Sequence, residues 1–124
     1  MHADEPRTED LTLTAVMAAL GDPMRVAIVR QLASDGERTC GTFELGISKA
    51  TRSHHFRVLR EAGLTHTRAE GTHRHVSLRR DAVDERFPGL LSAILAAAEQ
   101  EAGEGRGTAA EPAAAVALAT AVPS

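Results

Sequence analysis

The segment SKATRSHHFRVLREAGL, residues 48–64, constrains the fold most, because it predicts one basic amphipathic helix with a defined start and end. The Ser48 side chain can accept a hydrogen bond from the free amides of a first helical turn. Gly63 can take the left-handed conformation that commonly ends a helix. The apolar residues at helical spacing are Phe56, Leu59 and Ala62. We therefore expect one face of this helix to pack on a core and the other to present basic and hydroxyl side chains.

Two shorter helices are predicted before this segment. Apolar residues recur at helical spacing over residues 11–20, and Gly21 would end that helix. Asp22 and Pro23 then form a helix start, since Asp accepts hydrogen bonds from free amides and Pro presets the backbone angle. We expect the second helix over residues 24–33. Its buried residues would be Val26, Ile28, Val29 and Leu32.

A β-hairpin and a last helix are predicted after the basic helix. The segment LTHTRAEGTHRHVSLRR, residues 64–80, contains two short β-like runs around a turn at Glu70 and Gly71. Pro88 is expected to open the last helix. The apolar stripe of that helix would be Leu90, Leu91, Ile94, Leu95 and Ala98. The predicted fold class is therefore mainly α-helical with a small β-hairpin.

The length of 124 residues leaves room for one compact core. We expect a folded domain over residues 11–102, preceded by a disordered tail over residues 1–10. Residues 103–124 are rich in Gly, Ala, Glu and Pro and predict a second disordered tail. Aromatic residues make up 2% of the sequence, so the core must be built from aliphatic side chains. A core this thin would gain from dimerisation.

The sequence contains no signal that favours export or a membrane. Its single cysteine, Cys40, cannot form an intrachain disulfide. The first ten residues are acidic and polar, unlike a secretory signal. The longest apolar stretches are shorter than the ~20 residues that span a bilayer. We therefore expect a cytoplasmic protein.

The basic residues are concentrated in one part of the chain, although the formal net charge is −3. Residues 22–80 carry a net charge of +5, whereas residues 1–21 carry −3 and residues 81–124 carry −5. Five of the six histidines lie in residues 48–80. Attraction to phosphates supplies most of the non-specific affinity of proteins for DNA, so this distribution favours double-stranded DNA as a partner.

Two segments carry a resemblance to a known family. LGDPMRVAIVRQL, residues 20–32, and the basic helix over residues 48–64 resemble the ArsR/SmtB family of small bacterial winged-helix repressors. The segment EGTHRHVSL, residues 70–78, is similar to the wing of that family. The resemblance implies a winged helix-turn-helix fold and a homodimer formed by the first and last helices. It also implies a transcription regulator that places its basic helix in the major groove of a palindromic operator.

The residues carried over as DNA-facing are Lys49, Ala50, Thr51, Ser53, His54 and Arg57, and Arg68 and Arg74 of the hairpin are expected to face phosphates. Hydroxyl, imidazole and guanidinium groups can bind base edges or phosphates, and a methyl group can contact thymine. Arg52 and Arg60 leave two alternatives open, surface packing or DNA contact. His55 lies beside Phe56 and is expected to be packed, so His54 is the better functional candidate.

The implied dimer interface combines the first and last helices. Its predicted residues are Leu13, Val16, Met17, Leu20, Leu90, Leu91, Ile94, Leu95 and Ala98. The last helix exposes an apolar stripe that a small monomer could not fully cover, which favours a second copy of the chain as its partner.

The ligand sets through which ArsR/SmtB proteins often sense metals are missing here. These sets are a Cys-x-Cys pair before the turn, or Asp and His ligands on the last helix. Cys40 stands alone, and the last helix contains no His or Cys. A metal site needs several imidazole or thiolate donors that converge on one ion. We therefore expect no cofactor and no metal at these positions.

The remaining metal candidates are the hairpin histidines His66, His73 and His75. A two-residue turn would bring them to one face of the hairpin. A three-residue turn would pair Leu64 with Leu78 and send His66 to the opposite face from His73 and His75. We favour the three-residue turn, because it joins Leu64, Val76 and Leu78 into one apolar face.

Four functions are compared. An enzyme is the least favoured, because no nucleophile or acid–base pair stands in a recognisable setting and no Gly-rich phosphate loop is present. The leading expectation is a DNA-binding regulator whose signal arrives through a partner protein, with a small molecule at the dimer interface as the next choice. The alternatives are a direct metal sensor that uses the hairpin histidines, and a protein-interaction adaptor that binds through its last helix and tail.

Overall fold

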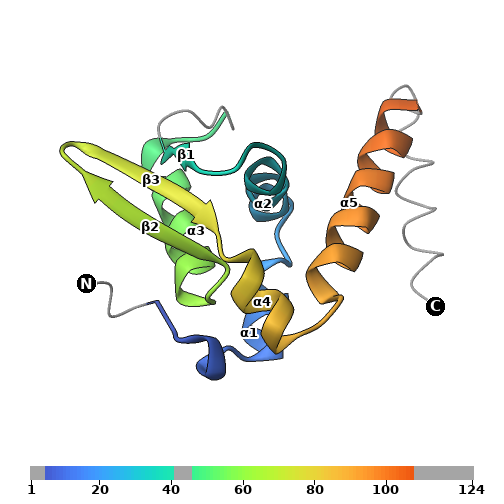
Figure 1. The fold of residues 1–124 in the computed structure, drawn as a ribbon. Helices are drawn as coiled ribbons and strands as arrows, with labels where there is room; N and C mark the ends of the chain where they lie inside the picture. The colour runs from blue at the N-terminus through green and yellow to red at the C-terminus, as the bar shows by residue number, and fades with distance from the viewer. Residues whose placement is uncertain (1–4, 41–45, 108–124) are drawn as a thin grey trace. The chain divides into compact units, whose positions relative to one another are not determined.

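The computed structural model describes residues 5–40 and 46–107, which form two compact units with their boundary between Leu91 and Ser92. A short 3-10 helix spans Thr8–Asp10. The helices are α1 (Leu13–Ala19), α2 (Pro23–Asp35), α3 (Lys49–Glu61), α4 (Arg80–Arg86) and α5 (Leu90–Gly107), and the strands are β1 (Arg38–Thr39), β2 (Thr65–Glu70) and β3 (His73–Leu78) (Figure 1). The predicted fold class, mainly α-helical with a small hairpin, is confirmed. Strand β1, which pairs with β3, was not predicted.

Helix α2 begins where the sequence predicts. The Asp22 carboxylate accepts hydrogen bonds from the amides of Met24 and Arg25, at 2.9 and 3.2 Å, and Pro23 is the first helical residue. The helix ends at Asp35, two residues later than predicted, before Gly36 at φ 79°. The buried residues are Ile28, Val29 and Leu32, while Val26 is half-buried.

The predicted limits of α3 are also confirmed. The Ser48 hydroxyl accepts a hydrogen bond from the Thr51 amide at 3.1 Å. At the other end Gly63 has a φ of 88°, and the Leu64 amide donates to the Leu59 carbonyl at 3.0 Å. A Cβ at Gly63 would collide with the Leu11 side chain. Glycine is therefore required at this position by both the turn and the packing.

The strands form an antiparallel sheet in the order β1-β3-β2. Its register differs from both sequence predictions, because Glu70 pairs with His73 across a turn of Gly71 and Thr72. Gly71 supplies the positive φ of 63° that tight hairpin turns need. Leu64 does not pair with Leu78, since it belongs to the end of α3 and its carbonyl accepts from the Arg79 amide at 2.8 Å.

This register decides which hairpin side chains share a face. Side chains alternate between the two faces of a strand, so Thr67, Val76 and Arg74 lie on one face. The three histidines lie together on the other, which corrects the expectation that His66 would be separated from His73 and His75.

The core lies between the inner face of the sheet and helices α2 and α3, which contact β3 and β2 respectively (Figure 1). Its apolar residues are Leu11, Val16, Ala19, Ile28, Val29, Leu32, Phe56, Leu59, Ala62, Leu64, Val76, Val83 and Leu91. Aliphatic side chains dominate this core, as the composition requires. The core holds the inward face of α3 and thereby decides which of its residues face outward.

The segment Glu5–Leu11, here called the N-terminal strap, is tied to the hairpin and to α4. The Glu5 carboxylate accepts from the Thr67 amide at 3.2 Å and lies 2.8 Å from His66 Nδ1. Arg79 donates to the Pro6 carbonyl at 2.7 Å. The predicted disordered tail therefore does not extend to residue 10. The free edge of β2 exposes amides that need acceptors, and a carboxylate supplies one.

The last two helices also differ from expectation. Helix α4 was not predicted as a separate element, and α5 begins at Leu90 rather than at Pro88. A positive φ of 84° at Gly89 redirects the chain between them. Helix α5 continues to Gly107, inside the tail predicted from residue 103. The rest of that tail lies outside the described residues. Among the described helices, none has the length and apolarity to cross a membrane.

Candidate nucleic-acid interface

The outward face of α3 carries the residues that the sequence predicted as DNA-facing. The exposed residues are Lys49, Ala50, Thr51, Ser53, His54 and Arg57. This orientation follows from the burial of Phe56 and Leu59, which turns the opposite side of the helix toward solvent. The Thr51 hydroxyl is partly engaged, since it accepts a hydrogen bond from Ser48 Oγ at 3.0 Å.

His55 is a packed residue, as predicted, with 9% of its surface exposed. Arg25 Nη1 lies 3.2 Å from His55 Nδ1, and because arginine can only donate, this ring nitrogen is the acceptor. The same arginine donates from Nε to the Ala19 carbonyl at 2.6 Å. The Asp22 carboxylate lies 3.9 Å from the same ring nitrogen. One cluster therefore connects the end of α1, the start of α2 and the middle of α3.

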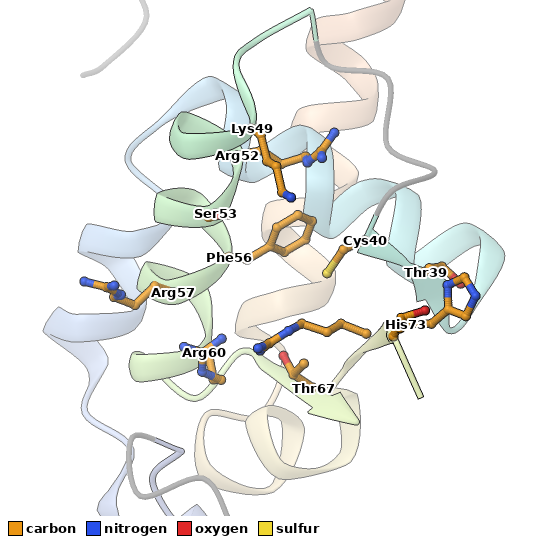
Figure 2. Close-up of a pocket in the computed structure, with 12 residues that line it drawn as sticks. Thr39, Cys40, Lys49, Arg52, Ser53, Phe56, Arg57, Arg60, Thr67 and His73 are labelled. Atoms are coloured by element: carbon orange, nitrogen blue, oxygen red, sulfur yellow. The ribbon is translucent and has the colours of Figure 1, made fainter. Parts of the chain in front are cut away.

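A groove of about 640 Å³ lies between α3 and the hairpin (Figure 2). The residues that line it are Thr39, Cys40, Lys49, Arg52, Ser53, Phe56, Arg57, Arg60, Thr67, Thr72, His73 and Arg74. Five of these side chains are Lys or Arg, and none of these lining residues is Asp or Glu. A concave surface of one charge sign concentrates oppositely charged ligands around it.

The basic residues outside this groove have partners of their own. Arg68 lies 2.9 Å from Glu37 and 3.6 Å from Glu70, and Arg80 lies 3.4 Å from Asp84. By contrast, no acidic residue in the described ranges forms an ion pair with the four groove residues Lys49, Arg52, Arg57 and Arg74. These four residues thus gather positive charge that no carboxylate of the described chain neutralises along α3 and the inner face of the hairpin. Arg25, Arg79 and Arg86 lie outside the groove and donate to backbone carbonyls.

The two hairpin arginines predicted to act together are separated by the sheet. Arg74 lines the groove, whereas Arg68 pairs with His75 on the opposite face. The hydrogen bond from Arg68 lowers the pKa of Glu37 and in turn raises the pKa of Arg68 itself. Arg68 is therefore ion-paired on the outer face, and Arg74 is the hairpin arginine that shares a surface with α3.

Comparison with known proteins agrees with this arrangement. The family described as "Helix-turn-helix domain" matches residues 20–68, which include α2, β1 and α3. The uncharacterized HTH-type transcriptional regulator YceK of Bacillus subtilis (strain 168) is 40% identical over 91 residues, which cover 71% of this chain and 91% of that protein. The chain belongs to the HTH-type transcriptional regulators. A second uncharacterized HTH-type regulator, MJ1325 of Methanocaldococcus jannaschii, is 39% identical over 59 residues, covering 46% of this chain and 66% of that protein.

Membership in this family makes the protein a DNA-binding regulator, because the helix-turn-helix is a DNA-binding motif. The alternation of apolar and basic positions along α3 already indicated this role in the sequence. Arg52 and Arg60, which the sequence left open, lie in the groove on either side of Phe56. Their spacing of four residues from Phe56 is the signal that places all three along one side of the helix.

Cys40 of this regulator lies half-buried in the groove. Burial raises the pKa of its thiol, although Arg74, Arg52 and Arg60 act in the opposite direction. The sequence did not indicate this position, because Cys40 reaches the groove through the pairing of β1 with β3.

The hairpin histidines lie on the outer face, away from the groove floor, except that His73 also lines the groove. His66 contacts Glu5, and His75 Nε2 lies 3.1 Å from Glu70. The rings of His73 and His75 are 6.4 Å apart. Within residues 5–40 and 46–107, no group of three or more His, Cys, Asp and Glu side chains has a geometry that could hold a metal ion.

The residues predicted for the dimer interface of the regulator differ in how far the single chain buries them. Val16 and Leu91 are fully buried in the single chain, so they belong to its own core. Leu13 and Met17 of α1 are 45% and 55% exposed. Leu20 is half-buried. The predicted residues of α5 are Leu90, in the first unit, and Ile94, Leu95 and Ala98, in the second.

Proposed function

We propose that this regulator is a homodimeric repressor of the ArsR/SmtB type that reads a palindromic operator with α3 in the major groove. The observation that supports the proposal is the distribution of positive charge. Among the basic side chains without an ion-pair partner in the described chain, Lys49, Arg52, Arg57 and Arg74 line one groove between α3 and the hairpin, whereas Arg68 and Arg80 are paired elsewhere. Contacts to phosphates supply affinity and orient a protein on DNA.

The side chains of α3 would divide the work of recognition. Ser53, His54 and Arg57 are exposed on the outward face and can donate to or accept from base edges. Ala50 offers a methyl group for contact with thymine. Lys49 at the first turn is suited to a phosphate. Arg68 is left out of this interface because Glu37 already neutralises it.

A second copy of the chain would cover the apolar face of α1. Leu13 and Met17 are the large apolar side chains that the described chain leaves most exposed. The apolar residues of α5, Leu90, Ile94, Leu95 and Ala98, would also contact the second copy. A two-fold dimer presents two identical recognition helices, and an operator of matching symmetry is therefore expected to be palindromic.

The signal that controls this regulator would enter by a route other than the usual metal ligands. Cys40 stands alone, and α5 contains no His or Cys. Release of DNA requires an effector with different affinities for the bound and free states. A protein co-regulator and a small molecule both meet that requirement. We expect zinc or nickel at one ion per subunit to leave operator binding unchanged.

The test is binding of the full chain to DNA sequences selected by it from a random pool, measured by fluorescence anisotropy. Arg57→Ala should weaken binding about tenfold or more, since one base contact contributes about 1–3 kcal/mol. Arg80→Ala removes the same charge from α4, outside the groove, and should change affinity little. Equal losses in the two variants, or no selected sequence, would exclude α3 as the reading helix.

A further inference from the structure

We propose that the groove between α3 and the hairpin is a binding site for a small amphipathic organic anion, with its charged group on Arg52 and Arg74 and its apolar part against Phe56 and Cys40. All four residues line the same groove. The DNA-binding role assigns the groove no small ligand. This inference adds one, and only its regulatory consequence rests on the proposed function.

The dimensions of the groove suit a small molecule. Its volume of about 640 Å³ lies within the range of roughly 300–1,000 Å³ typical of ligand sites. Two of its lining residues, Phe56 and Thr67, are only 6% and 3% exposed. A DNA duplex would contact the rim, where Lys49 and Ser53 are exposed. A ligand that reaches Phe56 must be smaller than a DNA duplex.

The charge of the groove selects an anion. Arg52 and Arg74 come from different elements, α3 and β3, and no carboxylate of the described chain forms an ion pair with either. A guanidinium group binds carboxylate, phosphate and sulfonate oxygens through paired hydrogen bonds. Because two such groups from different elements line one groove, it offers an oxyanion more donors than a single arginine on a flat surface does.

The apolar residues of the groove favour a ligand that also has an apolar part. Figure 2 shows the Phe56 ring of α3 and the Cys40 thiol pointing toward one another in the groove. Burial raises the pKa of this thiol in spite of the nearby arginines, which keeps the sulfur neutral at pH 7. A neutral thiol and an aromatic ring form an apolar surface. An inorganic anion would gain nothing from that surface, whereas a ring-bearing anion would.

Occupation of the groove would oppose DNA binding. An anion between Arg52 and Arg74 neutralises charge that the proposed interface offers to phosphates. Because coupling between two ligands is reciprocal, DNA must weaken binding of the anion by the same factor. The anion therefore acts as a releasing signal that needs neither a metal nor a partner protein.

The first experiment uses Cys40 as a reporter, because it is the only cysteine in the sequence. The probe is 8-anilinonaphthalene-1-sulfonate, a ring-bearing sulfonate, and sodium sulfate supplies charge without a ring. Saturating anilinonaphthalene sulfonate should slow alkylation of Cys40 by iodoacetamide at least threefold in the full chain, whereas equimolar sulfate should not. Binding of the probe without protection of Cys40 would overturn the proposal, because the probe would then sit elsewhere, for example on Leu13 and Met17.

Substitutions of Arg52 and Arg74 test whether these two residues bind the charged group of the probe. Arg74→Gln and Arg52→Gln should each lower the affinity for the probe at least fivefold and reduce the protection of Cys40. Arg80→Gln makes the same charge change on α4 and should leave the affinity for the probe and the protection of Cys40 unchanged. Thermal melts identify any variant that fails to fold. Unchanged affinity in Arg74→Gln, whose side chain is exposed and whose loss leaves the core intact, would overturn the site.

Competition with DNA separates this inference from the proposed function. Wild-type protein should bind its selected DNA without the probe and should lose at least tenfold in affinity when the probe is saturating. Binding of DNA without protection of Cys40 by the probe would refute the anion site and leave the regulator intact. Protection of Cys40 without any DNA binding would refute the proposed function and leave the anion site intact.

Discussion

Arg25 Nη1 donates to His55 Nδ1 over 3.2 Å, and this hydrogen bond connects the start of α2 to the middle of α3. The adjacent residue, His54, is exposed to solvent on the same helix. These two neighbouring histidines therefore have different roles. His55 holds the helix in its rotational position, and His54 belongs to the surface that the rotation exposes.

We expect His55→Ala to lower the free energy of unfolding by about 2 kcal/mol, because it removes a buried acceptor and leaves a gap in the packing. His54→Ala should change it by less than about 0.5 kcal/mol, as exposed substitutions usually do. Urea denaturation followed by circular dichroism measures both. Equal losses in the two variants would show that His55 does not support α3.

Glycine at residue 63 should matter more than glycine at residue 36. Both residues have positive φ, but a Cβ at Gly63 would collide with Leu11, whereas a Cβ at Gly36 meets nothing within 4 Å. Gly36→Ala should cost about 1 kcal/mol through backbone strain alone. Gly63→Ala should cost about 2 kcal/mol more, because overpacking adds to the strain. Thermal melts of the two variants give the comparison, and similar melting temperatures would contradict it.

The proposed dimer predicts that Leu13→Glu combined with Met17→Glu yields a folded monomer. Both side chains are largely exposed in the single chain, so the substitutions leave its core intact. Leu91→Glu should instead unfold the protein, because Leu91 is fully buried. Sedimentation gives the oligomeric state and circular dichroism the folded state. A wild-type monomer at micromolar concentration would be the contrary result.

The reaction of Cys40 with iodoacetamide should have its pH midpoint above 9.0, the ordinary thiol pKa, because burial raises the pKa of this thiol. Alkylation requires the thiolate, so the rate follows the deprotonated fraction. Arg74→Gln should move the midpoint higher still, since Arg74 stabilises the thiolate. The measurement is a rate profile from pH 7 upward in the absence of other anions. A midpoint below the ordinary value would show that the arginines outweigh burial.

Lys49→Ala should weaken DNA binding equally on all sequences and flatten the salt dependence by about one unit, as expected for loss of one phosphate contact. Arg57→Ala should instead relax sequence preference, because it removes a base contact. Anisotropy titrations over a range of salt concentrations separate the two effects. A Lys49→Ala variant with an unchanged salt slope would remove this residue from the interface.

Local signals in the sequence specify where α3 begins and ends and where α2 begins, although they did not reveal α4 or the limits of α5. Ser48, Asp22 and Gly63 act within one turn of their own position, because capping and left-handed turns depend on neighbouring residues alone. The amphipathic spacing around Phe56 likewise separated the buried from the exposed face of α3. Such local signals also separated His55 from His54.

Only the tertiary structure decided which distant residues share a surface. The hairpin register placed Arg74 beside α3 and Arg68 on the far face, and a shift of one residue in pairing exchanges the two faces. That register depends on a two-residue turn at Gly71 and Thr72. It also depends on Leu64, which belongs to the end of α3 and therefore does not form the pair with Leu78 that the apolar pattern of the hairpin had suggested. Cys40 reaches the groove through β1, and Glu5 reaches β2 through a free strand edge. These contacts join segments far apart in the chain, so no local pattern can specify them.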